Sequence, residues 1–360
     1  MNLGVLKKVN KKFLPQNYLF HPEWIVLGVN NVCNLHCKMC DIGTQNLDSN
    51  FAQNLVGTHP LNMPLDLIKK VIDDTAAYYP KSKLAYAFTE PLVYPHLIES
   101  LEYADKKQLR TTITTNALTL KHKAKKLVDA GINEVYVSLD GPQDVHNEIR
   151  GHKKSFQKAL EGIEELLSGP KKPRVSIICA ITEWNIEVLH ELLESLKHLP
   201  IHDIGFMHTQ FVTKAAAQLH EDSPWNVLYP ASDSNIDLLN FDNMDLDRLL
   251  LEIQTIKKSD YPFKVYFSPE ITTKENLALY YHQTEKIIGK LCHAVYTSIM
   301  IKSDGSVIPA HGRCYNLTLG NMHEQTLKEI WSSDVLRRLR TDLHKAGGLF
   351  PACSRCCSAF

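Results

Sequence analysis

Apolar and polar positions along this chain follow two different periods, and these predict its secondary structure. Short continuous apolar runs, beginning with residues 24–29, are typical of buried strands. Between them lie segments whose apolar residues recur every three or four positions, the pattern of a helix with one buried face. The expected strands are residues 24–29, 84–89, 110–116, 134–140, 175–182 and 204–211, and the expected helices are residues 64–72, 97–107, 120–130, 156–167 and 188–198.

This alternation predicts an α/β fold with six strand–helix units. Parallel strands need crossover connections such as these helices, and right-handed crossovers curl a sheet towards a barrel. Six units predict a partial, TIM-like (β/α)6 barrel over residues 21–213 rather than the closed barrel of eight. An open, doubly wound sheet is the structural alternative, because it shows the same alternation.

Two other stretches lack a period. Residues 44–62 are polar and predict a loop. Residues 214–247 contain Trp225 and Tyr229 beside a run of Ser, Asp and Asn, and either a lining for a polar substrate or a plain surface excursion explains them. A helix at 246–256, a strand at 263–267 and a helix at 272–288 follow, so residues 214–290 are interpreted as an insert and bridging segment.

Residues 291–360 predict a small α+β unit. Asp304-Gly305 stands between the apolar runs 296–302 and 306–309, which is a hairpin signal. A long amphipathic segment at 326–343 predicts one helix near the end of the chain.

Composition narrows the function classes. The 40 Lys and Arg residues balance 40 Asp and Glu, so no bulk charge favours nucleic acid. Mean hydropathy is −0.21, and no apolar run is long enough to span a bilayer. Residues 1–20 hold four lysines but too short an apolar run for a secretory signal; we expect a flexible basic arm, with weak membrane-surface contact as the alternative. Nine clustered cysteines predict a cytoplasmic location and metal binding rather than disulfides.

Three of these cysteines, Cys33, Cys37 and Cys40, follow the first expected strand directly. Three thiolates on one loop can hold three irons of a four-iron cluster. The next cysteine is Cys179, so one iron can remain open to a substrate, as in catalytic metal sites. A zinc loop or a reactive thiol cluster is the alternative, although zinc sites prefer paired Cys-x2-Cys knuckles.

This C-x3-C-x2-C loop resembles the signature of radical S-adenosylmethionine (SAM) enzymes, a family built on a partial barrel. The resemblance implies that the open iron binds the amino and carboxylate groups of SAM. It also implies that an electron from the 4Fe-4S cluster splits SAM into methionine and a 5′-deoxyadenosyl radical. Met39 stands where the family usually has an aromatic residue, near the adenine, and Met can fill such a gap.

The ends of the second and third expected strands extend the resemblance. Glu90 lies in a segment similar to the family's Gly-Gly-Glu-Pro motif, with Phe88 and Thr89 in place of the glycines. The resemblance implies that Glu90 faces the SAM amino group; a plain surface acid is the alternative. Asn116 lies in a segment similar to Thr-Asn-Gly, with Ala117 for Gly, and is expected near the adenosine unless it only caps a turn.

The end of the fourth expected strand completes the SAM set. Ser138-Leu139-Asp140-Gly141 is similar to the family's Ser-Leu-Asp-Gly, so Ser138 is expected at the SAM ribose or carboxylate, a turn residue being the alternative. Arg150 lies in a His-x3-Arg-Gly pattern and is expected to pair with the SAM carboxylate, or else to be a surface Arg. On the sixth strand, alternation puts His208 and Gln210 on one face, so His208 is a candidate catalytic or substrate-contact residue; a partnered core histidine is the alternative.

The C-terminal cysteines resemble the auxiliary iron–sulfur extension called SPASM, or its shorter form, twitch, over residues 292–357. The family's second cysteine falls where this chain has Ala310, so two ligand sets are open. In the preferred set, Cys314 takes that place; in the other, Cys357 or His311 substitutes. Four cysteines close a four-iron cluster, and a structural zinc ribbon is the alternative. The preferred ligands of the auxiliary 4Fe-4S cluster are Cys292, Cys314, Cys353 and Cys356.

These features imply a radical SAM oxidoreductase or epimerase in which the protein positions a substrate for hydrogen abstraction. An auxiliary cluster that takes the remaining electron gives alcohol oxidation; a thiol that returns a hydrogen gives epimerisation, for which Cys179, Cys314 and Cys357 are candidates. Only 32 residues precede Cys33, which suggests no leader-binding domain and predicts a small polar substrate such as a sugar or aminocyclitol.

Three alternatives remain open at this point. They are a peptide maturase of the ribosomal-peptide or sulfatase-activating type, a non-catalytic iron–sulfur protein, and a zinc protein. The resemblance also implies an electron donor such as flavodoxin or ferredoxin, and neither a nucleic-acid nor a membrane partner is expected.

Overall fold

One ten-stranded sheet runs through the computed structural model, which describes residues 3–234 and 241–360. The strand order is β10-β9-β8-β1-β2-β3-β4-β5-β6-β7. All neighbours from β8 to β7 are parallel, and only the pairs that involve β9 are antiparallel. The strands are β1 Trp24–Leu27, β2 Lys83–Tyr86, β3 Arg110–Thr115, β4 Glu134–Ser138, β5 Arg174–Ile181, β6 Asp203–His208, β7 Lys264–Ser268, β8 Ser298–Ile301, β9 Ser306–Pro309 and β10 Gly320–Asn321.

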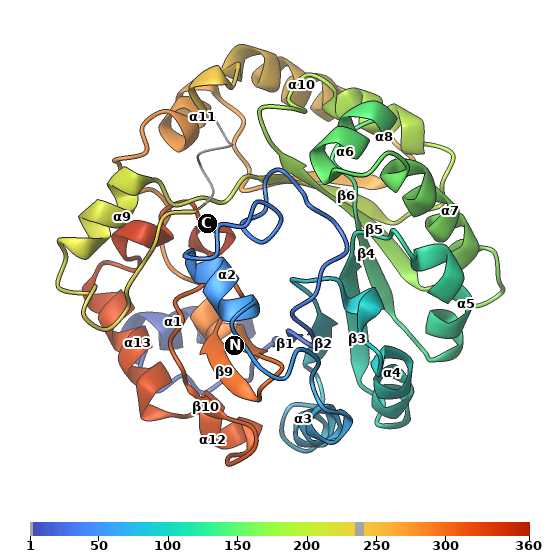
Figure 1. Cartoon of the computed structure of the whole chain (residues 1–360). Helices are drawn as coiled ribbons and strands as arrows, with labels where there is room; N and C mark the ends of the chain where they lie inside the picture. Colours follow the sequence, from blue (N-terminus) through green and yellow to red (C-terminus); the bar gives the residue numbers. More distant parts are fainter. Residues whose placement is uncertain (1–2, 235–240) are drawn as a thin grey trace.

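The sheet is curled, and helices cover its outer side (Figure 1). The strand order has two ends, β7 and β10, so the barrel is open, and the expectation of a partial barrel is confirmed over the doubly wound alternative. The helices are α1 Leu3–Phe13, α2 Asn50–Leu55, α3 Leu65–Tyr78, α4 Leu97–Lys106, α5 Leu120–Asp129, α6 Gln143–Arg150, α7 Ser155–Leu167, α8 Leu189–Leu196, α9 Lys214–Glu221, α10 Leu246–Lys258, α11 Lys274–Tyr281, α12 Leu327–Trp331 and α13 Asp334–Lys345. None of these described helices is long and apolar enough to cross a bilayer.

The C-terminal segment continues the barrel sheet. Strand β8 pairs with β1 along its whole length, from Trp24 opposite Ser298 to Leu27 opposite Ile301. The predicted hairpin is present as β8 and β9. Beyond it, the indole of Trp331 donates to the Phe20 carbonyl at 3.0 Å, so the last helices are also fastened to the start of the barrel.

The segment predicted as a flexible basic arm is instead folded over residues 3–13, as helix α1. Lys7 pairs with Glu23 at 2.7 Å. The buried side chain of Asn10 bonds the carbonyls of Leu14 and Asn17 at 3.0 Å, so the helix end and the following chain are held together. The prediction missed this because an isolated short helix is marginal and gains its stability from docking.

Three other predicted boundaries are corrected. The stretch predicted as a loop at 44–62 contains α2, whose first turn is capped by the Ser49 hydroxyl. The single helix expected at 326–343 is two helices, because Ser333 caps the start of α13 and ends the continuous run. Helix α11 also ends at Tyr281 rather than continuing to 288.

The insert after β6 packs on the C-terminal segment. Trp225 and Tyr229 stack on Phe350 with ring centroids 5.2 and 5.0 Å away, and the Tyr229 hydroxyl donates to Asp342 at 2.8 Å. These aromatic residues therefore join two segments rather than line a substrate site. Part of the Ser, Asp and Asn run, residues 235–240, lies outside the described residues.

Candidate active site at the mouth of the barrel

The loop with the first three cysteines is clamped at the end of β1. The Lys38 amide donates to the Ile149 carbonyl of α6 at 2.9 Å. A Cβ on Gly43 would lie 2.6 Å from the backbone oxygen of Cys37, and one on Gly151, where φ is +66°, would lie 3.0 Å from the His36 carbonyl. The loop therefore turns back on itself and rests on the end of α6, at two places where only glycine fits.

The three thiols on this loop suit a positively charged metal group. Burial raises the pKa of Cys37 to about 11, an effect that the nearby Arg150 opposes and the Cys40 thiol adds to. Burial also raises the pKa of Cys33, with a smaller contribution from Cys40. A thiol must lose its proton to bind iron, so the positive charge of the metal has to offset this effect of burial. The loop brings three thiols to one strand end, as a cluster would need, and that Cys33, Cys37 and Cys40 would hold it stays a prediction.

Arg150 lies behind this loop in a buried polar network. Its Nε donates to Asp140, and its guanidinium lies 3.8 Å from the Cys37 sulfur. Nδ1 of His146 accepts from the Asp140 amide at 3.0 Å, and burial lowers the pKa of this histidine to about 3, so it is neutral. Arg150 therefore contacts the cluster loop; its predicted pairing with the SAM carboxylate stays a prediction.

Glu90 is fully buried and accepts three hydrogen bonds, from the Thr115 hydroxyl at 2.6 Å, the Asn116 amide at 2.8 Å and the Leu92 amide at 3.0 Å. Burial raises its pKa in spite of these donors. The Asn116 side chain in turn donates to Asn34 at 2.8 Å and lies 3.9 Å from the Cys33 sulfur. Glu90 thus fixes the end of β3, and with it Asn116, against the cluster loop.

The other two predicted SAM residues are Ser138, which ends β4, and Met39, on the first cysteine loop. Ser138 is half-buried at the end of β4, and Met39 is half-buried and packs on the main core. Their roles stay predictions.

Two non-glycine residues at these strand ends adopt the positive φ that glycine favours. Phe88 has φ +85° and Ala117 has φ +61°. Each costs about 1–2 kcal/mol relative to an ordinary backbone conformation. Both strand-end turns therefore form here without glycine at these positions.

The C-terminal cysteines form a second group. Burial raises the pKa of Cys314 well above its usual value, and the neighbouring thiols of Cys292 and Cys353 raise it further. The Tyr315 hydroxyl lies 3.1 Å from the Cys353 sulfur. Ala310, four residues before Cys314, has φ +63°, and the place of Cys314 in the preferred ligand set stays a prediction.

Two buried side chains hold this second group in place. Asn54 of α2 donates to the carbonyls of Gly312 and Cys314 at 2.9 and 2.7 Å. Arg355, between the last cysteines, donates to the carbonyls of Leu279, Gln283 and Tyr280 at 2.8, 2.9 and 3.1 Å. It therefore ties the final cysteine loop to the end of α11. Neither residue was predicted, since a lone Asn or Arg carries no sequence signal.

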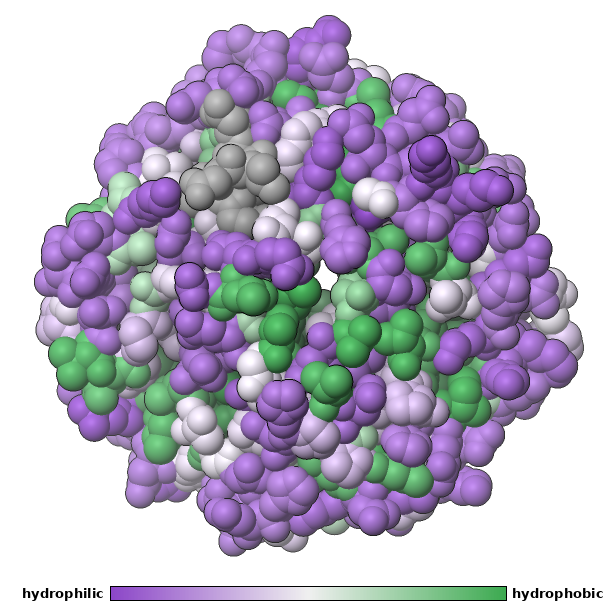
Figure 2. All heavy atoms as spheres, viewed as in Figure 1, coloured by the Kyte–Doolittle hydropathy of each residue, from purple (hydrophilic) through white to green (hydrophobic). Residues whose placement is uncertain are grey.

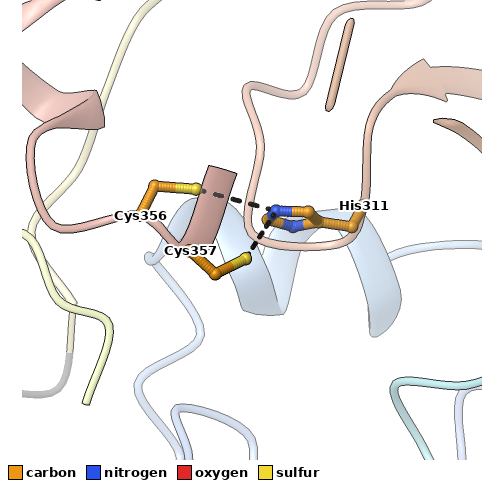
Figure 3. Close-up of side chains that lie close together, drawn as sticks. All are labelled: His311, Cys356 and Cys357. Carbon is orange, nitrogen blue, oxygen red and sulfur yellow. Dashed lines mark hydrogen bonds between the residues drawn. The ribbon is translucent and has the colours of Figure 1, made fainter. Parts of the chain in front are cut away.

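His311, Cys356 and Cys357 form a compact set at the edge of the second group (Figure 3). Nε2 of His311 lies 3.7 Å from the Cys356 sulfur and 3.8 Å from the Cys357 sulfur. Both residues named as substitutes for the missing cysteine are therefore close to Cys356.

A cavity of about 90 Å³ opens on the second cysteine group, because Cys292, Cys314, Cys353 and Cys356 all line it. The first cysteine loop reaches it only through Asp41, the residue after Cys40, and the rest of the lining includes Phe51, Gln210, Ser232 and Arg313. Figure 2 shows that hydrophobic side chains border the hollow at the centre of this face, within a largely hydrophilic surface. Arg313 was not singled out from the sequence, although its place beside Cys314 was a usable signal.

His208 does not line this cavity. Its Nδ1 bonds the Tyr281 hydroxyl at 2.7 Å, and its ring packs on Tyr280. Burial lowers its pKa to about 3. His208 is thus a neutral core histidine bonded through Nδ1, and its buried Nε2 has no hydrogen-bond partner in the described part of the chain, so its predicted substrate contact stays a prediction. Gln210, two residues further on, lines the cavity.

Comparison with known sequences identifies both parts of the chain. The Radical SAM superfamily profile matches residues 28–196, and the SPASM profile, an iron-sulfur cluster-binding domain, matches residues 292–357. The AdoMet-dependent heme synthase of Methanosarcina barkeri is 26% identical over 341 residues, 89% of this chain and 85% of that protein. The GTP 3′,8-cyclase of Helicobacter pylori is 30% identical over 55% of this chain and 60% of its own. The match to the Fe-coproporphyrin III synthase of M. barkeri, 27% identical, covers 55% of this chain and 47% of that protein, so the chain spans about half the length of such relatives.

Solved structures share the fold. SuiB of Streptococcus suis, bound to its precursor peptide SuiA, is 17% identical with a TM-score of 0.63 over 98% of this chain and 75% of its own. The protein anSMEcpe, with bound AdoMet and the Cp18Cys peptide, is 16% identical with a TM-score of 0.57 over 88% of this chain and 82% of its own. The chain therefore belongs to the radical SAM superfamily, with SAM and a 4Fe-4S cluster in the barrel and an auxiliary iron–sulfur cluster in a C-terminal SPASM domain.

Proposed function

We propose that this enzyme oxidises a side chain of a peptide, holding it in the cavity beside the second cysteine group. The observation that carries the proposal is a cavity lined both by Asp41, the residue after Cys40, and by the cysteines of the second group. A substrate at the Asp41 side of this cavity would lie near the end of the first cysteine loop and face the second group. When bound, SAM and the barrel cluster would supply the radical that removes one hydrogen atom, and the auxiliary cluster would take the remaining electron as a proton leaves to solvent.

The cavity supplies groups that suit a peptide. Gln210 and Ser232 offer donors and acceptors for backbone amides, and Phe51 offers an apolar surface. The Asn50 amide donates to the Ser232 hydroxyl at 2.7 Å, so α2 and the insert form one wall. The guanidinium of Arg313 packs 4.5 Å from the centre of the Phe51 ring and 3.7 Å from Asp41, which holds it at the cavity.

Peptide substrates are favoured over the small polar substrate expected from the sequence. Two structures with this fold, SuiB and anSMEcpe, have peptides bound. Oxidation is favoured over epimerisation, because the predicted ligands of the auxiliary cluster line the cavity and would hold an electron acceptor beside the substrate. Among the thiols considered for epimerisation, Cys314 has Cys292 and Cys353 as neighbours, Cys357 lies 3.8 Å from His311, and Cys179 is buried in the core, 3.7 Å from the Asn185 side chain.

The substrate class can be tested without knowing the substrate. The anaerobically reconstituted enzyme is incubated with SAM, dithionite and fractions from fully deuterated bacteria: digested protein, carbohydrates, or small metabolites. We expect deuterium in 5′-deoxyadenosine only with the peptide fraction, and products that have lost deuterium from carbon without taking up protium from the water there. Transfer from carbohydrate alone, or solvent protium at the reacted carbon, would contradict the proposal.

A further inference from the structure

His311 lies where it can act on the auxiliary cluster without ligating it. Its Nε2 lies 3.7 and 3.8 Å from the sulfurs of Cys356 and Cys357, and Figure 3 shows the ring edge pointing between them. The ligand atoms of all three residues lie within 4.8 Å of one another, a spacing that one metal ion also accepts. Whether Nε2 of His311 binds a metal or donates a hydrogen bond depends on which ring nitrogen carries the proton.

The hydrogen bond at the other ring nitrogen, Nδ1, indicates where the proton lies. Nδ1 of His311 accepts a hydrogen bond from the Arg313 amide at 3.2 Å. A nitrogen that accepts has no proton of its own, so in the neutral ring the proton is on Nε2. Nε2 then has no lone pair for a metal but has an N–H aimed at sulfur. This arrangement indicates a hydrogen-bond donor.

The ring is held in this orientation from both sides. Phe88 stacks on it with centroids 5.9 Å apart and 21° between the planes. A Cβ on Gly312 would lie 3.3 Å from both Phe88 and Phe51, so the loop packs closely on the barrel. The histidine is thus fixed by residues at the mouth of the barrel, while its N–H points towards the sulfurs of Cys356 and Cys357.

We propose that His311 is a positioning residue that donates its Nε2–H to the sulfur of the last auxiliary-cluster ligand and raises the reduction potential of that cluster. The donor reaches whichever of Cys356 and Cys357 ligates, because the two distances are nearly equal. A donor to a ligating sulfur stabilises the more negative, reduced cluster, which is how hydrogen bonds tune iron–sulfur potentials. The benefit to catalysis rests on the proposed oxidation, in which this cluster accepts an electron; the hydrogen bond itself does not.

The test isolates the auxiliary cluster in the full-length chain. Cys33, Cys37 and Cys40 are changed to Ala, and the auxiliary cluster is reconstituted and titrated potentiometrically with detection by electron paramagnetic resonance. We expect His311→Ala to move the potential to more negative values while iron and sulfide content is unchanged, and His311→Gln, which restores an N–H, to recover part of the shift. His344→Ala, at an exposed histidine of α13, is the matched control and is expected to leave the potential unchanged.

Two results would overturn the inference. One is an unchanged potential in His311→Ala with the cluster intact. The other is loss of cluster iron together with a strong ¹⁴N coupling in the parent protein, which would make His311 a ligand. Neither readout uses a substrate, so failure of the proposed peptide oxidation would leave this test intact, and the reverse also holds.

Discussion

The two cysteine groups are built in different ways. The barrel group lies on a single loop, and backbone contacts position it: the Lys38 amide and the close approaches at Gly43 and Gly151. The C-terminal group is assembled from three separate stretches, and it depends on two buried side chains, Asn54 and Arg355. The cysteines of both groups can be found in the sequence, but the distant side chains that hold the second group in place cannot.

The largest effect on SAM cleavage and iron content is expected when one thiol is removed from each group. We expect Cys37→Ala to reduce SAM cleavage to the background rate, because the barrel cluster loses one of three ligands, while the auxiliary iron remains. The matched change, Cys314→Ser, should lose the auxiliary iron and retain SAM cleavage in the absence of substrate. Iron analysis and assay of 5′-deoxyadenosine measure both. Retention of all auxiliary iron in Cys314→Ser would indicate that Cys357, rather than Cys314, is the remaining ligand.

A smaller effect, on protein stability, is expected when Arg355, which holds the last cysteine loop, is removed instead of a metal ligand. Arg355→Ala leaves several buried carbonyls at the end of α11 without a donor, and should destabilise the protein by about 3 kcal/mol. Arg337→Ala is the control, since its exposed pair with Asp334, at 3.4 Å, contributes less than about 1 kcal/mol. Denaturant unfolding of the cluster-free chain measures both. Equal effects would show that the C-terminal group does not depend on this anchor.

The smallest effect concerns a turn in the barrel group. Ala117 has φ +61°, so Ala117→Gly should relieve strain and stabilise the protein by about 0.5 kcal/mol after the entropy of the unfolded chain is counted. Ala215→Gly, on the exposed side of α9, should instead destabilise it by about 0.5–1 kcal/mol. Thermal unfolding distinguishes the signs. Destabilisation by both would mean that the turn at Ala117 carries no strain.

Structure that follows local pattern could be predicted from the sequence. The six barrel strands, the helices α3, α4, α5, α7 and α8 and the β8–β9 hairpin were predicted, because period and turn chemistry are local properties. Helices α1 and α2 were not, since their stability comes from docking, and the short helix α6 was not predicted either. Strand alternation places His208 on a face but cannot show its contact with Tyr281, and no local pattern shows that Arg313 lines the cavity.

The pairing of β8 with β1 has a consequence for electron transfer. The first cysteine loop follows β1, and Cys292 and Cys314 flank the β8–β9 hairpin. Since β1 and β8 are hydrogen-bonded neighbours in one sheet, no hinge separates these two strands. The gap that an electron must tunnel across is therefore set when the chain folds and does not depend on a later domain motion. Exchanging this C-terminal segment for that of another enzyme would preserve the gap only if the strand register were preserved as well.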